Sequence, residues 1–157
     1  MTNPPRVRRR IERAVALRPR TEPAELSDGQ LTAWVMSPLA RCARAAMDPD
    51  DWFPVTATLE GARAEARHAL AMCAVCPVRA ECLELSLRHW RTIGRHGIWG
   101  GLVEAERAAA RRQWLTGSPV TALLRSGADS HISCAGAASG RGPRAPIVSS
   151  LWRGHTR

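Results

Sequence analysis

An apolar stripe runs through residues 57–72, in the middle of the chain. Its members recur at steps of three or four residues, the spacing of one face of an α-helix; they are Leu59, Ala62, Ala66, Ala69 or Leu70, and then Cys73. The pattern predicts a helix that buries Leu59 and Leu70 and points Cys73 into the interior. His68 lies off the stripe, and we therefore expect it to be exposed and not to be a metal ligand.

Two other helices are predicted from their end residues. Ser27 offers an N-cap for a helix that ends before Pro38, because a residue that precedes proline disfavours the helical conformation. An alanine-rich helix spans residues 102–115 and ends before Gly117. With the helices of residues 57–72 and 77–90, these predict an all-α fold, a small domain of about four helices.

The helix that starts near Pro77 brings one cysteine toward two others. Pro77 fits the first helical position, where its missing N–H costs nothing, and the helix runs to about Trp90. This makes Cys76 the predicted N-cap residue, where the positive end of the helix dipole favours a thiolate. Further along the helix, Cys82 turns toward Cys76 and Cys73.

Four cysteines indicate a metal site with thiolate ligands: Cys42, Cys73, Cys76 and Cys82. Soft thiolates select zinc, copper(I) or iron–sulfur clusters. Structural zinc sites usually have two close cysteine pairs, whereas here only Cys73 and Cys76 form one. Iron–sulfur sites tolerate a long gap to one cysteine and sometimes have a proline after another, as at Pro77, so the spacing favours a cluster. A redox dithiol of Cys73 and Cys76 is the third alternative, although no strand–helix alternation surrounds it.

The two ends of the chain differ in composition from its middle. Residues 1–27 are rich in arginine and proline and predict a flexible basic arm. Residues 117–157 are rich in Gly, Ser, Ala and Pro and predict a low-complexity, disordered tail. The folded domain is expected at residues 28–116, and Cys134, which stands alone in the tail, is expected to take no part in the site.

The net charge of +9 is carried by arginine alone, since the chain has no lysine. Either solvated helix faces and flexible ends account for this excess, or the partner is a polyanion such as DNA, whose phosphates arginine neutralises. On the last helix the two alternatives concern Arg107, Arg111 and Arg112. No signal peptide and no apolar run of about 20 residues is visible, so we expect a cytoplasmic protein without a membrane partner.

Two loops place aromatic side chains between the predicted helices. Residues 48–54 form an acidic, proline-bounded loop that contains Trp52 and Phe53. Residues 94–101 hold four glycines around Trp99 and predict turns. In each loop the aromatic side chains either cover the core or the metal site, or face a partner.

Together these motifs resemble the WhiB-like family of regulators. The similarity covers roughly residues 30–115 and rests on Asp51-Trp-Phe-Pro54, Cys73-x-x-Cys76-Pro-Val, Cys82-Leu and Gly97-Ile-Trp-Gly-Gly101, followed by a basic helix. The resemblance implies one [4Fe-4S] cluster per chain, held by the four cysteines, and docking on the C-terminal region of the primary sigma factor of RNA polymerase. It also implies a sigma-binding set, Trp52, Phe53, Pro54, Gly97, Trp99, Gly100 and Gly101, and a DNA-contacting set, Arg107, Arg111 and Arg112.

The hypothesis that follows is a transcriptional regulator that responds to oxygen or nitric oxide, binds the sigma factor as a monomer and contacts promoter DNA through its basic residues. The cluster would hold the helices of Cys73 and Cys82 on the loop of Cys42, and so order the turn of Trp99. Two alternatives stay open: an apo form that acts as a dithiol disulfide reductase, and a DNA-binding protein stabilised by zinc on four cysteines. No nucleophile–base pair, phosphate loop or carboxylate dyad is visible, so we expect a protein that is not an enzyme.

Overall fold

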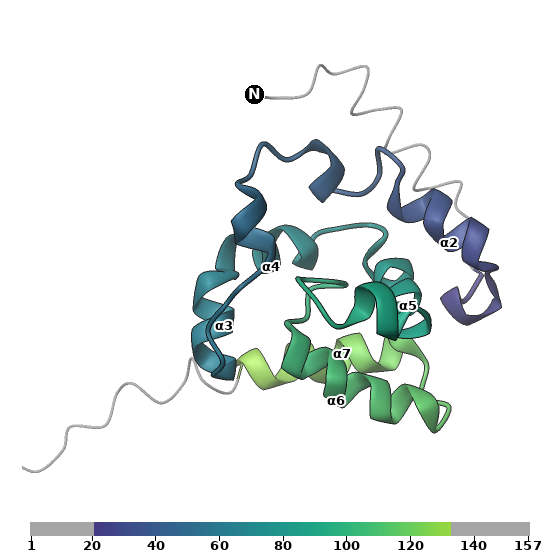
Figure 1. Cartoon of the computed structure of the whole chain (residues 1–157). Helices are drawn as coiled ribbons and strands as arrows, with labels where there is room; N and C mark the ends of the chain where they lie inside the picture. The colour runs from purple at the N-terminus through teal and green to yellow at the C-terminus, as the bar shows by residue number, and fades with distance from the viewer. Residues whose placement is uncertain (1–20, 133–157) are drawn as a thin grey trace, which may run out of the picture.

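The computed structural model describes residues 21–132, and the side chains of residues 21–126. This part of the chain is helical and contains no β-strand; its one isolated antiparallel bridge joins Trp99 and Leu102 (Figure 1). The α-helices are α2 (Asp28–Val35), α3 (Leu59–Glu65), α4 (Arg67–Ala74), α5 (Arg79–Arg88), α6 (Glu104–Leu115) and α7 (Val120–Ile132). The 3-10 helices are η1 (Pro23–Glu25), η2 (Cys42–Arg44) and η3 (Pro49–Trp52), and η4 (Trp90–Gly94) is a single π-helical turn. The predicted all-α class is confirmed.

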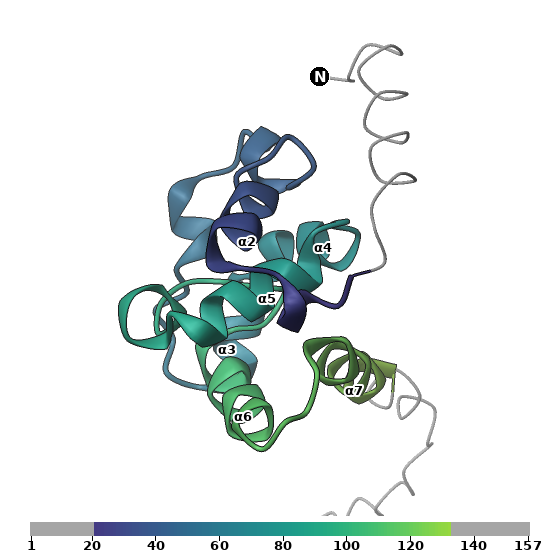
Figure 2. The ribbon, with the colours of Figure 1, turned by 90° about the vertical axis from the view of Figure 1, so that its right-hand side faces the viewer.

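Helix α5 is the element around which the others pack. It contacts η1, α2, η4, α6 and α7, and both views show it between α2 and the α6–α7 pair (Figures 1 and 2). Leu83 and Leu87 of α5 are fully buried in one apolar cluster with residues of α6 and α7. A second cluster joins α3 and α4 to Ile98 and Val103, so two packed groups of helices flank the segment that links α5 to α6.

The predicted helix of residues 57–72 is two helices. The helical conformation is interrupted at Ala66, which caps α3 and precedes α4, with φ −82° and ψ 8°. Ala62 of α3 and Ala69 of α4 both pack in the cluster of Ile98, so the two helices still bury part of the predicted stripe together. The expected burial of Leu59 was wrong: its exposed fraction is 45%.

Helix α2 begins where its cap residue predicts. The Ser27 hydroxyl accepts the N–H of Gln30, and the Gln30 side chain accepts the Ser27 N–H, which together form a capping box. The helix ends at Val35, before Pro38. Arg88 of α5 donates to the carbonyl oxygens of Leu26, Pro23 and Ala24, and so fixes η1 against α5. The ordered fold therefore starts before residue 28, where the sequence placed the domain boundary.

The C-terminal boundary also lies elsewhere than expected. Residues 117–157 were expected to be a disordered tail, but α7 occupies Val120–Ile132. Val120 and Leu123 are buried in the same cluster as Leu83, because the α7 stripe covers apolar surface that α5 and α6 leave open. Residues 1–20 and 133–157, and with them most of the predicted arm, the rest of the predicted tail and Cys134, lie outside the described residues. Within residues 21–132, no helix has the length and apolar character needed to span a membrane.

Candidate metal centre

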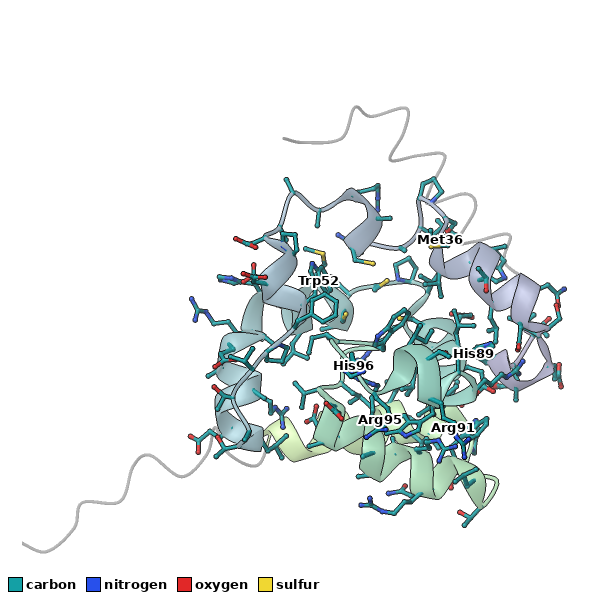
Figure 3. The ribbon with its side chains drawn as sticks, viewed as in Figure 1. Met36, Trp52, His89, Arg91, Arg95 and His96 are labelled. Carbon is teal, nitrogen blue, oxygen red and sulfur yellow. The ribbon has the colours of Figure 1, made fainter. Side chains whose placement is uncertain are left out.

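All four predicted ligand cysteines line one cavity of about 410 Å³. Cys42 begins η2, Cys73 lies in α4, Cys76 lies in the turn between α4 and α5, and Cys82 is the fourth residue of α5. The cavity thus joins segments that are 40 residues apart in sequence, from Cys42 to Cys82. The remaining lining is mostly apolar and includes Met36, Trp52 and Phe53; Met36 and Trp52 are labelled in Figure 3.

The turn between α4 and α5 differs from the prediction in one respect. Helix α5 begins at Arg79 with Val78 as its N-cap, so Cys76 is not the N-cap residue. Instead, the N–H of Cys76 donates to the carbonyl oxygen of Cys73 at 3.1 Å, and the N–H of Arg79 donates to that of Cys76 at 3.3 Å. These two backbone hydrogen bonds form the turn that brings Cys73 and Cys76 to the same cavity. They place Cys76 before helix α5 rather than in its first turn. The prediction that Cys76 occupies the N-cap, at the positive end of the helix dipole, was wrong.

Burial dominates the electrostatics of the cysteines. Desolvation raises the pKa of the Cys82 thiol to about 12 and that of Cys73 to about 11, and it also raises the pKa of Cys42. The neighbouring cysteines add to each rise, because several thiolates in one cavity repel one another. Without a metal, Cys73 is therefore a thiol at neutral pH. A disulfide reductase needs a low-pKa thiolate as its nucleophile, and the surroundings of Cys73 work against that alternative.

The donor set can be tested against the two metal sites that the sequence left open. A single tetrahedral zinc ion has Zn–S bonds of about 2.3 Å, so its four sulfurs lie only about 3.8 Å apart. In the described part of the chain, no three His, Cys, Asp or Glu side chains are arranged to hold one metal ion. The cysteines are four of the residues that line a cavity of about 410 Å³. Thiolates are the ligands that iron–sulfur clusters take in proteins, so this donor set fits a multi-iron cluster.

The backbone of the glycine-rich turn of residues 97–101 is hydrogen-bonded to the sulfurs of two of these cysteines. The N–H of Gly100 donates to Sγ of Cys82 at 3.3 Å, and the backbone of Gly101 hydrogen-bonds Cys73 and lowers its pKa against the effect of burial. Gly100 has φ +58°, and a Cβ there would lie 2.6 Å from Cβ of Leu83. Glycine is required because any other side chain would push this N–H away from the sulfur.

The aromatic loop of residues 52–54 packs against the same turn. The N–H of Ile98 donates to the carbonyl oxygen of Trp52 at 2.9 Å. Gly97 has φ +64°, and a Cβ there would lie 2.8 Å from Cε1 of Phe53. Phe53 is 56% exposed, and Pro54 is half-buried beside it. Trp99 is half-buried, and its indole N–H donates to the carbonyl oxygen of His96 at 3.0 Å.

The structure therefore brings the residues of the predicted sigma-binding set together at one side of the cysteine cavity. Five of them line the cavity itself: Trp52, Phe53, Gly97, Trp99 and Gly100. The other two, Pro54 and Gly101, are the next residues along the same two loops. A partner that covered the exposed face of Phe53 would also lie next to the cysteines.

Arg107 corrects the predicted DNA-contacting set. Its side chain is fully buried, with an exposed fraction of 0%, and donates five hydrogen bonds to backbone carbonyl oxygens. The acceptors belong to Gly94, His96, Gly97 and Leu102. Burial lowers its pKa to about 10, which still leaves the guanidinium charged at neutral pH. Arg107 cannot reach DNA; it holds the chain between η4 and α6 in place. Of the other two, Arg112 is exposed and Arg111 is half-buried.

Two further residues belong to this site and were not singled out from the sequence. Arg79 lines the cavity and donates to the carbonyl oxygen of Gly100 at 2.9 Å, so it supports the turn as Arg107 does. Its position between Cys76 and Cys82 was the available indication, since a basic side chain there lies close to the metal ligands. Met36, 76% exposed, lies at the edge of the cavity, where the chain leaves α2.

The fold and the site define a class: a small all-helical domain with a candidate cysteine metal site beside a glycine–tryptophan turn. Comparison with known proteins gives the family. The model of the family described as transcription factor WhiB matches residues 34–110. The chain is 41% identical over 73 residues to the transcriptional regulator WhiB2 of Mycobacterium tuberculosis, which covers 46% of this chain and 70% of that protein. It is 38% identical over 73 residues to the transcriptional regulator WhiB of Streptomyces coelicolor, covering 46% and 71%. The chain belongs to the WhiB family.

A third relative matches the chain over a similar number of residues. The transcriptional regulator WhiB1 of Mycobacterium tuberculosis is 39% identical over 66 residues, covering 42% of this chain and 74% of that protein. No solved structure matches the chain. The matched segment of residues 34–110 contains all four cavity cysteines, the two aromatic loops and Arg107, but it ends before Arg111 and before α7.

Proposed function

We propose that this protein is a cytoplasmic transcriptional regulator that binds one [4Fe-4S] cluster through Cys42, Cys73, Cys76 and Cys82, docks on the C-terminal region of the primary sigma factor, and contacts promoter DNA. The observation that carries the proposal is the cavity of about 410 Å³ that these cysteines line beside the Trp99 turn. The relatives' names, which describe transcriptional regulators, support the general role.

The chain's own residues give the proposal its mechanism. Bound to a cluster, the four cysteines would tie η2, α4 and α5 together around the cavity. The N–H of Gly100 and the backbone of Gly101 hydrogen-bond the sulfurs of Cys82 and Cys73. When bound, a [4Fe-4S] cluster supplies a centre for electron transfer and for attack by oxygen or nitric oxide. Loss of the ligand sulfurs from their positions would remove the acceptors of these two backbone donors. The turn that carries Trp99 would then lose one of its anchors.

The sigma-binding surface is proposed at the exposed side of this turn. Trp99, Phe53 and Trp52 present aromatic area next to the cavity opening, and aromatic side chains of this kind are the usual anchors of protein interfaces. Because this surface is built on the same backbone that bonds the cysteine sulfurs, the state of the metal centre and the shape of the docking surface are coupled. Regulation through the sigma factor follows from that coupling.

DNA contact is proposed for the basic residues that remain accessible on α6, Arg111 and Arg112. Arg107 is not included, since it is fully buried. The net charge of +9 gives the chain a general attraction to DNA that added salt weakens.

Oxygen-free purification tests the proposal directly. A brown protein with about four irons per chain, and an absorbance band that bleaches in air or nitric oxide, is the expected result. A colourless protein that holds one zinc ion tightly would rule out the cluster and favour the zinc alternative. Insulin reduction by the metal-free form would instead favour the reductase, and the raised pKa of Cys73 predicts that this activity is absent.

A further inference from the structure

A second pocket lies at the end of α5, and none of its lining residues belongs to the cysteine cavity. It has a volume of about 270 Å³ and is lined by Arg88, His89, Trp90, Arg91, Thr92 and Arg111. The lining contains no carboxylate. Small-molecule sites usually begin at about 300 Å³ and are mainly apolar, so this pocket suits one charged group of a larger ligand better than a complete cofactor.

Two of the side chains in this pocket already have partners. Arg88 forms ion pairs with Glu84 at 2.8 Å and with Asp28 at 2.9 Å. Nε2 of His89 lies 2.9 Å from the other carboxylate oxygen of Asp28. The charge of Arg88 is therefore largely balanced inside the fold, and these two residues form the wall of the pocket rather than its binding groups.

The other two arginines have no such partner. Among the described residues, neither Arg91 nor Arg111 has a carboxylate within ion-pair distance. Arg91 is exposed on η4 (Figure 3), and Arg111 of α6 lines the same pocket. Two arginine side chains from different elements thus line one small pocket. An anion bound between their guanidinium groups would offset the repulsion between the two positive charges.

Arg111 is held in position by packing and not by a hydrogen bond. Its guanidinium carbon lies 5.5 Å from the centre of the Trp90 ring, a cation–π arrangement. Its Nε is buried and has no hydrogen-bond acceptor in the part of the chain that the structure describes. The side chain is thus packed in place while its Nε–H has no acceptor among the described residues. Such preorganisation lowers the entropic cost of binding an anion.

We infer that Arg91 and Arg111 form a clamp for a phosphate group of the DNA backbone. Arginine binds phosphate in a bidentate manner, and two such side chains match its oxygens. The exposed Arg95 and Arg112 flank the clamp on the following loop and on α6, and extend the positive surface for neighbouring phosphates. The inference rests on the proposed function, and it adds η4 to the DNA-contacting surface, which the sequence placed on the last helix alone.

The first test is the salt dependence of DNA binding by the full chain in its metal-bound form. Fluorescence anisotropy on a labelled duplex gives the slope of log affinity against log salt concentration. In an Arg91→Gln/Arg111→Gln double variant, the slope should become flatter by about one, since the two arginines share one phosphate and each lost phosphate contact removes about one unit. The control is Arg67→Gln/Arg125→Gln, which removes two exposed arginines from α4 and α7 and should leave the slope unchanged.

The second test uses inorganic pyrophosphate and nuclear magnetic resonance. The Nε–H of Arg111 is buried and should exchange slowly enough to be observed. Saturable shifts of this resonance and of the Arg91 side chain, with none at Arg67, are expected. Equal shifts at all three, or no shift, would overturn the clamp. This readout also covers the case in which the double variant folds poorly, because it uses the unaltered protein.

The outcomes separate the clamp from the proposed function. DNA binding whose salt slope is the same in the double variant and in the unaltered chain overturns the clamp, but leaves the cluster and sigma docking intact. Pyrophosphate shifts in a protein that binds no DNA overturn the assignment of the clamp to DNA. A chain without cluster and without sigma binding, but with the expected flattening, contradicts the proposed function and retains the clamp as a phosphate site.

Discussion

Nη1 of Arg107 donates to the carbonyl oxygen of Gly97 at 2.6 Å, and this bond ties α6 to the glycine turn. The same guanidinium reaches the carbonyl oxygens of Gly94, His96 and Leu102. One buried cation therefore satisfies the backbone of a loop that has few bonds of its own. The residue expected to contact DNA instead supports the turn proposed to contact the sigma factor.

Replacing Arg107 with methionine should destabilise the protein by about 3 kcal/mol or more, because the carbonyl oxygens that it satisfies are left buried without donors. Thermal unfolding followed by circular dichroism under oxygen-free conditions measures the change. Arg112→Met on the same helix is exposed and should change stability by only about 0.5 kcal/mol. Equal effects of the two substitutions would mean that the Arg107 bonds contribute little.

Gly100→Ala should weaken the metal centre as well as the fold. The φ of +58° and the short approach to Leu83 force the backbone to move, which costs about 1–3 kcal/mol and displaces the N–H that bonds Cys82. Faster bleaching of the iron chromophore in air is the expected readout. Gly29→Ala is the control, since a Cβ there has nothing within 4 Å and alanine in helix α2 should stabilise by up to about 1 kcal/mol. Unchanged bleaching in the Gly100 variant would contradict the coupling of turn and sulfur.

Trp99→Ala should abolish co-purification with the sigma factor while the iron content is retained. The side chain is half-buried and packs at the cavity opening, so its loss removes an interface anchor without removing a ligand. Leu115→Ala, which removes an apolar side chain that is 60% exposed on α6, should leave sigma binding unchanged. If both iron and sigma binding survive in the Trp99 variant, the indole serves the fold alone.

Removal of the metal should loosen one side of the protein more than the other. The cluster of Leu83 and Leu87 with α6 and α7 contains no cysteine, whereas the other two apolar clusters include Cys73 and Cys76 at their margins. Hydrogen exchange of the metal-free form should therefore increase in η2, α4 and the Gly100 turn, while α5 to α7 stay protected. Uniform exchange along the whole chain would show instead that the metal holds the entire fold.

Leu123→Ala should cost about 2–4 kcal/mol, because Leu123 is only 6% exposed in the cluster with Leu83 and leaves a cavity when truncated. Urea unfolding gives the difference. Arg125→Ala on the same helix is exposed and should have little effect. A neutral Leu123 variant would mean that α7 is not part of the stable core, as the sequence-based boundary at residue 116 implied.

Local features of the sequence were sufficient to predict part of this structure. The capping box at Ser27 involves residues three apart, and helical periodicity involves residues three or four apart, so both are visible in a short window. His68 is exposed, as its place off the apolar stripe predicted. The aromatic and glycine loops that the sequence singled out both line the cysteine cavity. Their role in sigma binding stays a prediction.

By itself, the sequence determined the all-helical class, the residues with metal-binding chemistry and the family, because these depend on residue type and on short spacing. The tertiary structure decided which arginine is buried, where the helix of residues 57–72 bends and where the fold ends. Arg107, Arg111 and Arg112 are alike in type and close in sequence, yet their surroundings differ. Arg107 is buried and donates to the carbonyl oxygens of four residues, Arg111 packs on Trp90, and Arg112 is exposed to solvent. Burial is a property of what packs against a residue from distant parts of the chain, and that is settled only when the helices meet.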